Sequence, residues 1–189
     1  MHLTRHITRS HLRLLGIAAG AVLLATPTIR AQATNCATVR AVGMKMLSVP
    51  YHLYLVDSGG AQAALNGGKP TVGEVISAGG SMYVLSHGKW VKSPVSLAEM
   101  KAQQNNADSM KTTCTHLRDE SVNGEPAAVW RSHTVNEVAT IDTDMWISKR
   151  SGLLLKSTSI TDVGGGPMGK TRHTGRYDYT NVRVPAGVQ

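Results

Sequence analysis

The sequence VNGEPAAVWRSHTV (Val122–Val135), followed after three residues by ATIDTDMWISKRSGLLLKSTSIT (Ala139–Thr161), decides the fold of this protein. Asn123 and Gly124 favour a type I′ hairpin turn, because both residue types tolerate the positive φ that this turn requires. Ser151–Gly152 interrupts the second segment, and apolar residues resume after it. The pattern therefore predicts consecutive antiparallel strands joined by tight turns.

Alternation along Ala139–Lys149 separates an apolar side of one strand from a polar side. Ile141, Met145 and Ile147 fall on one face, and Asp142 and Asp144 on the other. The apolar face must be covered by another element. The two carboxylates could hold a cation or form an acid/base pair, but no third acid is near them in sequence, which favours a solvated face.

Residues 1–33 have the pattern of an export signal. Three arginines precede a short apolar run, Leu14–Ala25, and Ala31–Ala33 has the small-x-small pattern of a signal peptidase site. The run is shorter than the roughly 20 residues that a membrane span needs. We therefore expect a soluble periplasmic or secreted protein in which residues 34–189 form one domain, with no integral span after cleavage.

The charge does not favour nucleic acid as a partner. Four of the arginines and none of the acids lie in residues 1–33, so removing that segment lowers the formal net charge from +8 to +4. The remaining Lys and Arg residues are scattered singly among Ser and Thr rather than clustered.

The two cysteines, Cys36 and Cys114, predict a disulfide, since an even pair in an exported chain is usually oxidised. In the chain-entropy model such a closure contributes roughly 4 kcal/mol. A metal or redox pair is the alternative, but the C-x-x-C spacing that it would favour is absent.

The rest of the chain predicts further short strands and two helices. Ser96 and Glu99 form a capping box at the start of the second helix. The fold class is α+β, a strongly curved antiparallel sheet with about two helices covering one face. We expect helices at 36–47 and 97–110, a loose surface connection at 57–69, and strands at 51–56, 71–78, 81–87, 114–122 and 170–179.

No catalytic pattern is present in the sequence. Residues 164–171 match the phosphate-loop pattern G-x-x-x-x-G-K-[ST], but a strand rather than a helix is predicted to follow, so we interpret them as a flexible loop. No G-x-S-x-G motif occurs, and the histidines are spaced singly. We therefore expect no enzyme activity, no cofactor and no metal site.

The apolar composition favours an adaptable interior. Phenylalanine is absent and methionine is frequent, and methionine fits irregular apolar partners. A single curved sheet beneath a helical lid leaves an apolar hollow in which a hydrophobic ligand could bind. The residues that we expect to line it are Met82, Val84, Met145, Ile147, Leu153 and Leu155.

Four segments resemble the LolA/LolB-type lipoprotein carriers and their uncharacterised secreted relatives: Met82–Pro94, Glu120–Trp130, Asp144–Ser157 and Arg176–Pro185. The resemblance implies an open half-barrel, lidded by helices, that binds or carries a lipid or another hydrophobic ligand, with an envelope protein as a possible partner. Such carriers hold the lid with an inward arginine, for which Arg118 and Arg131 are the candidates. The alternative is a non-enzymatic structural or interaction module of the envelope that binds no ligand.

Overall fold

The computed structural model describes residues 36–105, 111–164, 166 and 169–189. The predicted signal peptide, the end of the predicted second helix and part of the phosphate-loop pattern lie outside this set. Within it, no helix is long and apolar enough to cross a membrane. The elements are α1 (Ala37–Met46), β1 (Tyr51–Gly59), α2 (Gly60–Leu65), β2 (Thr71–Ala78), β3 (Ser81–Ser86), β4 (Lys89–Lys92), α3 (Leu97–Asn105), β5 (Lys111–Val122), β6 (Glu125–Val135), β7 (Thr140–Ser148), β8 (Leu154–Asp162) and β9 (Lys170–Asp178).

All nine strands belong to one curved sheet in the order β4-β3-β2-β1-β9-β8-β7-β6-β5. Every neighbouring pair is antiparallel, and the sheet is not closed, since β4 and β5 are its edges. The last strand, β9, lies between β1 and β8, so the end of the chain joins the early hairpins to the central meander. This architecture confirms the predicted α+β class and the open antiparallel half-barrel.

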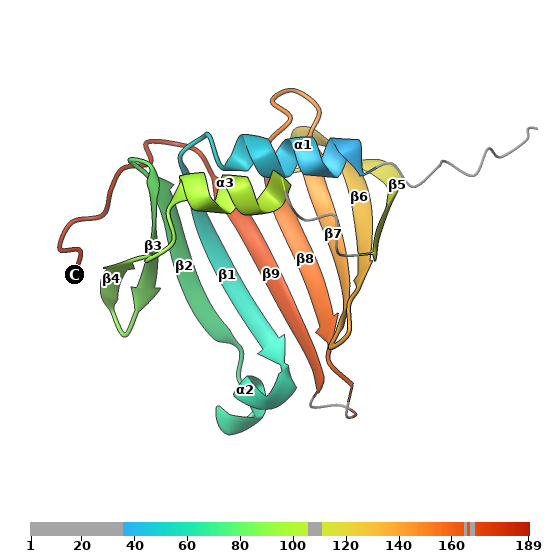
Figure 1. Ribbon diagram of the computed structural model, residues 1–189, viewed down its shortest axis with the longest axis horizontal. Coiled ribbons are helices and arrows are strands. Elements are labelled where there is room, and N and C mark those ends of the chain that lie inside the picture. Colours follow the sequence, from blue (N-terminus) through green and yellow to red (C-terminus); the bar gives the residue numbers. More distant parts are fainter. Residues whose placement is uncertain (1–35, 106–110, 165, 167–168) are drawn as a thin grey trace, which may run out of the picture. The chain divides into compact units, whose positions relative to one another are not determined.

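The two faces of the sheet differ in what covers them. Helices α1 and α3 cross one face (Figure 1). We call this the helix face and the opposite one the outer face. Because side chains alternate along a strand, Leu53 and Met145 belong to the helix face, and Tyr54 and Trp146 to the outer face.

The prediction of a loose connection at 57–69 was wrong. Strand β1 continues to Gly59 and is followed at once by α2. Gly59 and Gly60 both have positive φ, +77° and +67°, which turns the chain sharply. A Cβ on Gly60 would lie 2.2 Å from Thr171 Oγ1, so glycine also allows α2 to pack close to β9. This contact is non-local, and the composition of the segment did not reveal it.

The predicted turn between β5 and β6 is confirmed, with Asn123 at φ +52° and Gly124 at φ +82°. The prediction that Leu155 lines the hollow together with Leu153 was wrong. Strands β7 and β8 shift register after Trp146, so that Ile147 pairs with Leu154. Leu155 is left in the bulge and packs on the outer face against Trp146, while Leu154 is buried on the helix face.

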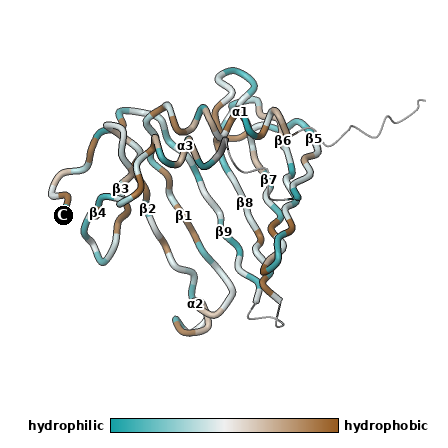
Figure 2. The backbone as a smooth tube through the Cα atoms, viewed as in Figure 1, coloured by the Kyte–Doolittle hydropathy of each residue, from teal (hydrophilic) through white to brown (hydrophobic). Residues whose placement is uncertain are grey.

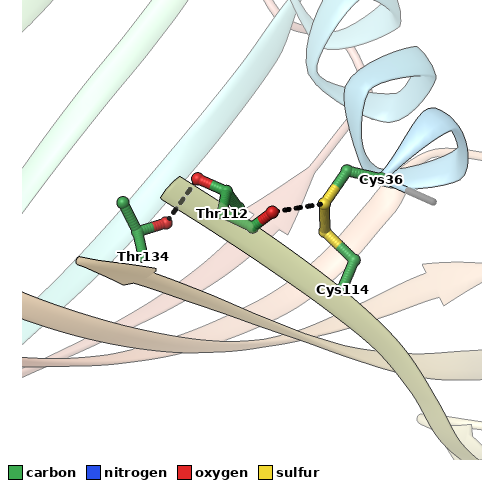
Figure 3. The surroundings of a disulfide bond; sticks show 4 residues. All are labelled: Cys36, Thr112, Cys114 and Thr134. Atoms are coloured by element: carbon green, nitrogen blue, oxygen red, sulfur yellow. Dashed lines mark hydrogen bonds between the residues drawn. A yellow bond between two sulfur atoms is a disulfide. The ribbon is translucent and has the colours of Figure 1, made fainter. Parts of the chain in front are cut away.

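The predicted disulfide between Cys36 and Cys114 is confirmed. It joins the residue before α1 to edge strand β5 (Figure 3). The carbonyl oxygen of Thr112 lies 3.9 Å from Cys36 Sγ, and the Thr112 hydroxyl contacts that of Thr134 on β6 at 3.0 Å. A covalent bond therefore holds the start of α1 at one edge of the helix face, and its presence is typical of an oxidising, exported environment.

We expect the C36S/C114S double variant to lose about 2–4 kcal/mol of unfolding free energy, because the unfolded chain regains the freedom that the bond removes. Urea denaturation of both proteins measures the difference. Reductant should lower the stability of the wild type and leave the double variant unchanged. Equal stability of the double variant and the wild type in the absence of reductant would contradict a structural role for the bond.

Candidate functional site

Helix α1 covers the apolar part of the helix face that lies over β7 and β8. Val42 and Met46 pack against Met145, Ile147 and Leu154, and all five side chains are buried. Burial of each such side chain contributes about 1.5–3 kcal/mol. This half of the helix face is therefore filled by the protein's own helix.

Polar contacts hold the C-terminal end of α1 to the sheet, as the disulfide holds its start. The Tyr179 hydroxyl donates to the Leu154 carbonyl at 2.5 Å and lies 3.0 Å from Met46 Sδ. The Lys45 ammonium donates to the Ser151 carbonyl in the turn before β8. With the disulfide at its other end, α1 is held to the sheet at both ends.

Beyond α1, an apolar row continues across the helix face toward the opposite edge of the sheet. Its side chains are cross-strand neighbours on five adjacent strands. Burial decreases along it, since Val75 is 7% exposed whereas Val84 and Val91 are 41% and 42% exposed. The apolar row consists of Tyr177, Leu53, Val75, Val84 and Val91.

The helix face becomes polar further along the strands, four residues from Leu53 on β1 and two residues from Met145 on β7. Asp57 Oδ1 lies 2.8 Å from His173 Nδ1, and the hydroxyls of Thr143 and Ser159 are 2.9 Å apart. These four residues are cross-strand neighbours on β1, β9, β8 and β7. The apolar surface beneath α1 thus ends at this polar region, and Ile141 lies beyond it on β7. The predicted hollow was expected to be apolar throughout.

Gly175 lies between the apolar row and this polar region. A Cβ there would stand 2.9 Å from Leu53 Cδ1 and 3.0 Å from Ser157 Oγ. Both distances are shorter than an ordinary van der Waals contact, so glycine allows Leu53 and Ser157 to lean over β9. The middle of the helix face is therefore filled by side chains from neighbouring strands.

The six residues predicted to line a ligand site lie in three different places. Met145, Ile147 and Leu153 belong to the core that α1 covers. Val84 lies on the apolar row, and Met82 is on the same face of β3. Leu155 lies on the outer face because of the register shift between β7 and β8. Only the β3 residues are therefore on the part of the helix face that lies beyond α1.

The arginines expected to hold the lid do not face it. Arg131 donates two hydrogen bonds to Asp144, from Nε at 2.6 Å and from a terminal nitrogen at 2.8 Å, and Arg118 donates to Glu120 at 2.7 Å. Both arginines lie on the outer face with Trp146. Neither candidate is therefore an inward arginine that could hold the lid.

The two aspartates of β7 have separate basic partners, because Asp142 contacts His133 Nδ1 at 2.7 Å while Asp144 contacts Arg131. They do not act as a pair on one ligand. Within the described ranges, no group of three or more His, Cys, Asp or Glu side chains could hold a metal ion.

No protein-family model and no curated protein sequence matches this chain. Among solved structures, it is similar to LprF from Mycobacterium bovis, with 8% identity and a TM-score of 0.40 over 80% of this chain and 96% of that one. It is also similar to an outer membrane lipoprotein-sorting protein domain from Vibrio parahaemolyticus, with 11% identity and a TM-score of 0.26 over 80% and 93% of the respective chains. Because both TM-scores lie below 0.5, we interpret the site from the geometry of this chain alone.

Three tyrosines lie beneath α1, and we expect their ionisation to lower the free energy of unfolding in alkali. Burial raises the pKa of Tyr51 to about 12, with a further contribution from nearby Tyr177, and burial also raises the pKa of Tyr177 and Tyr179. The unfolded value is about 10. The stability that these hydroxyls contribute is therefore fully present below about pH 10 and is lost as the pH rises toward about 12.

Urea unfolding at a series of pH values should show this fall, and the absorbance of ionised tyrosine should report deprotonation in the same range. The Y51F variant should show a smaller fall between about pH 10 and 12, because it lacks one of the shifted groups. An identical fall in both proteins would contradict the assignment to Tyr51.

Proposed function

We propose that this protein binds a hydrophobic ligand, such as a lipid acyl chain, on the helix face along the apolar row. It acts there as a non-enzymatic carrier in the periplasm or outside the cell. The observation that carries the proposal is the continuity of the row. It begins beside the core at Tyr177 and ends at Val84 and Val91, which are more than 40% exposed.

The packing of α1 supports the β1–β4 half as the binding region, which α3 rather than α1 crosses (Figure 1). The disulfide, Lys45 and Tyr179 hold α1 over the β7–β8 half, whose apolar side chains are already buried. An apolar chain laid along the row would run from β9 to β4, about 19 Å at the usual strand spacing. Each methylene removed from water would contribute about 0.8 kcal/mol.

The polar region around Asp57 and His173 limits the ligand. An apolar chain placed across these groups would remove them from water without replacing their hydrogen bonds, which is unfavourable. The apolar part of the ligand would therefore lie across the strands, along the apolar row, rather than parallel to the strands. A polar group on the same ligand could reach this region.

Titration with a fluorescent fatty acid tests the proposal, together with native mass spectrometry of protein purified from cells without delipidation. We expect V84E to bind about ten-fold more weakly, a difference of about 1.4 kcal/mol, because a carboxylate replaces apolar surface on the row. The matched control is V135E. Val135 is 42% exposed, close to Val84 at 41%, but lies on the outer face of β6.

A wild-type protein that carries no lipid and binds no fatty acid would overturn the proposal and favour an interaction module without a ligand. Equal weakening in V84E and V135E would show that binding does not follow the apolar row.

A further inference from the structure

Two cations lie side by side on the outer face, between two aromatic residues. The register places Tyr54 opposite Arg176, Arg176 opposite Lys156, and Lys156 opposite Trp146. These four residues, which we call the cation row, cross β1, β9, β8 and β7. Side chains directly opposite each other have Cβ atoms about 4.5–5.5 Å apart. The row is thus one contiguous surface at the centre of the sheet.

Each cation is positioned by the ring on its far side. The Arg176 guanidinium lies 4.7 Å from the ring centroid of Tyr54, and the Lys156 ammonium lies 4.5 Å from that of Trp146. Each cation therefore lies against a ring on the neighbouring strand. Contacts of this kind are attractive and restrict the side chains that make them.

The acids around the cation row already have other partners. Glu74, beside Tyr54, contacts His52 at 2.7 Å. Glu120 accepts hydrogen bonds from Arg118 and from the Trp146 indole, and Asp178 accepts from the Thr180 backbone N–H. Among the ion pairs found between described residues, none includes Lys156 or Arg176.

Like charges placed directly opposite each other in a sheet are destabilising. Here the sheet holds such a pair. Glu120 and Asp178 attract Lys156 and Arg176 without an ion-pair contact, whereas Arg118 and Arg131 on the same face each contact a carboxylate directly. Each cation contacts an aromatic ring, which accepts no conventional hydrogen bond, so the N–H groups of Lys156 and Arg176 remain as donors. Guanidinium and ammonium donors together suit a tetrahedral oxyanion, since arginine binds phosphate in a forked geometry and lysine supplies a point charge.

We propose that Lys156 and Arg176 form a binding site for a phosphate group on the outer face. The two residues are cross-strand neighbours, so both can donate to one anion, and Trp146 and Tyr54 restrict their side chains. The site is independent of the hydrophobic ligand on the helix face, because alternate side chains of the same strands form the two surfaces. Strand β9, which supplies Arg176, is hydrophilic along most of its length (Figure 2).

The Trp146 indole N–H is a direct reporter, because its ring contacts Lys156 and its N–H donates to Glu120. We expect titration with inorganic phosphate to shift its ¹H–¹⁵N signal in a saturable way at low salt. The K156Q/R176Q variant should bind at least ten-fold more weakly. K156M, which keeps the aliphatic stem over Trp146, should also bind more weakly while retaining the wild-type melting temperature.

A second arm identifies the source of the phosphate group. Co-sedimentation compares vesicles of phosphatidylglycerol with vesicles of phosphatidylcholine. Binding to the anionic vesicles that K156Q/R176Q abolishes identifies a lipid headgroup. Saturation by inorganic phosphate without vesicle binding identifies a soluble phosphate compound. Either result supports the site.

The control for net charge is K89Q/K111Q, which removes two exposed lysines away from the cation row. It should bind phosphate and vesicles as the wild type does. The proposal is overturned if neither probe binds, or if K89Q/K111Q weakens binding as much as K156Q/R176Q. It is also overturned if chloride at equal ionic strength produces the same shift of the Trp146 signal as phosphate.

Discussion

The attachment of α1 to the helix face is the constraint on which the rest of the structure depends. An open sheet exposes apolar side chains on both faces unless something covers them, and here Val42 and Met46 cover those of β7 and β8. The helix is short, and packing rather than propensity stabilises a helix of that length. The disulfide and the Lys45 and Tyr179 contacts keep it in place. Its side chains fill one half of that face, and α3 crosses the other half (Figure 1).

The period of two along the strands gives the sheet two chemically distinct surfaces. On the helix face, apolar residues gather near α1 and give way to Ser, Thr and the Asp57–His173 pair. On the outer face, carboxylates pair with some of the basic residues, whereas each of the two cations at the centre lies against an aromatic ring. A hydrophobic ligand and a phosphate group would therefore meet the protein on opposite sides of the same strands.

The differences between prediction and structure arise where a local pattern meets a distant partner. Alternation placed Met145 and Ile147 correctly but failed at Leu155, because a bulge opposite Trp146 shifts the register. Pairing across the sheet produces that bulge, and the leucine run alone does not show it. For the same reason α2 was missed, since Gly60 is close to Thr171 only after β9 has joined β1.

The sequence by itself determined the fold class, the β5–β6 turn, the disulfide pair and the capping box at Ser96, where the side chains of Ser96 and Glu99 bond as expected. Each of these depends on neighbouring residues or on the number of cysteines. Only the tertiary structure decided which apolar residues lie outside the core that α1 covers. The insertion of β9 between β1 and β8 sets the apolar row beside the core and brings Arg176 next to Tyr54. Pairing between strands more than a hundred residues apart depends on the packing of the whole sheet, and no local pattern encodes it.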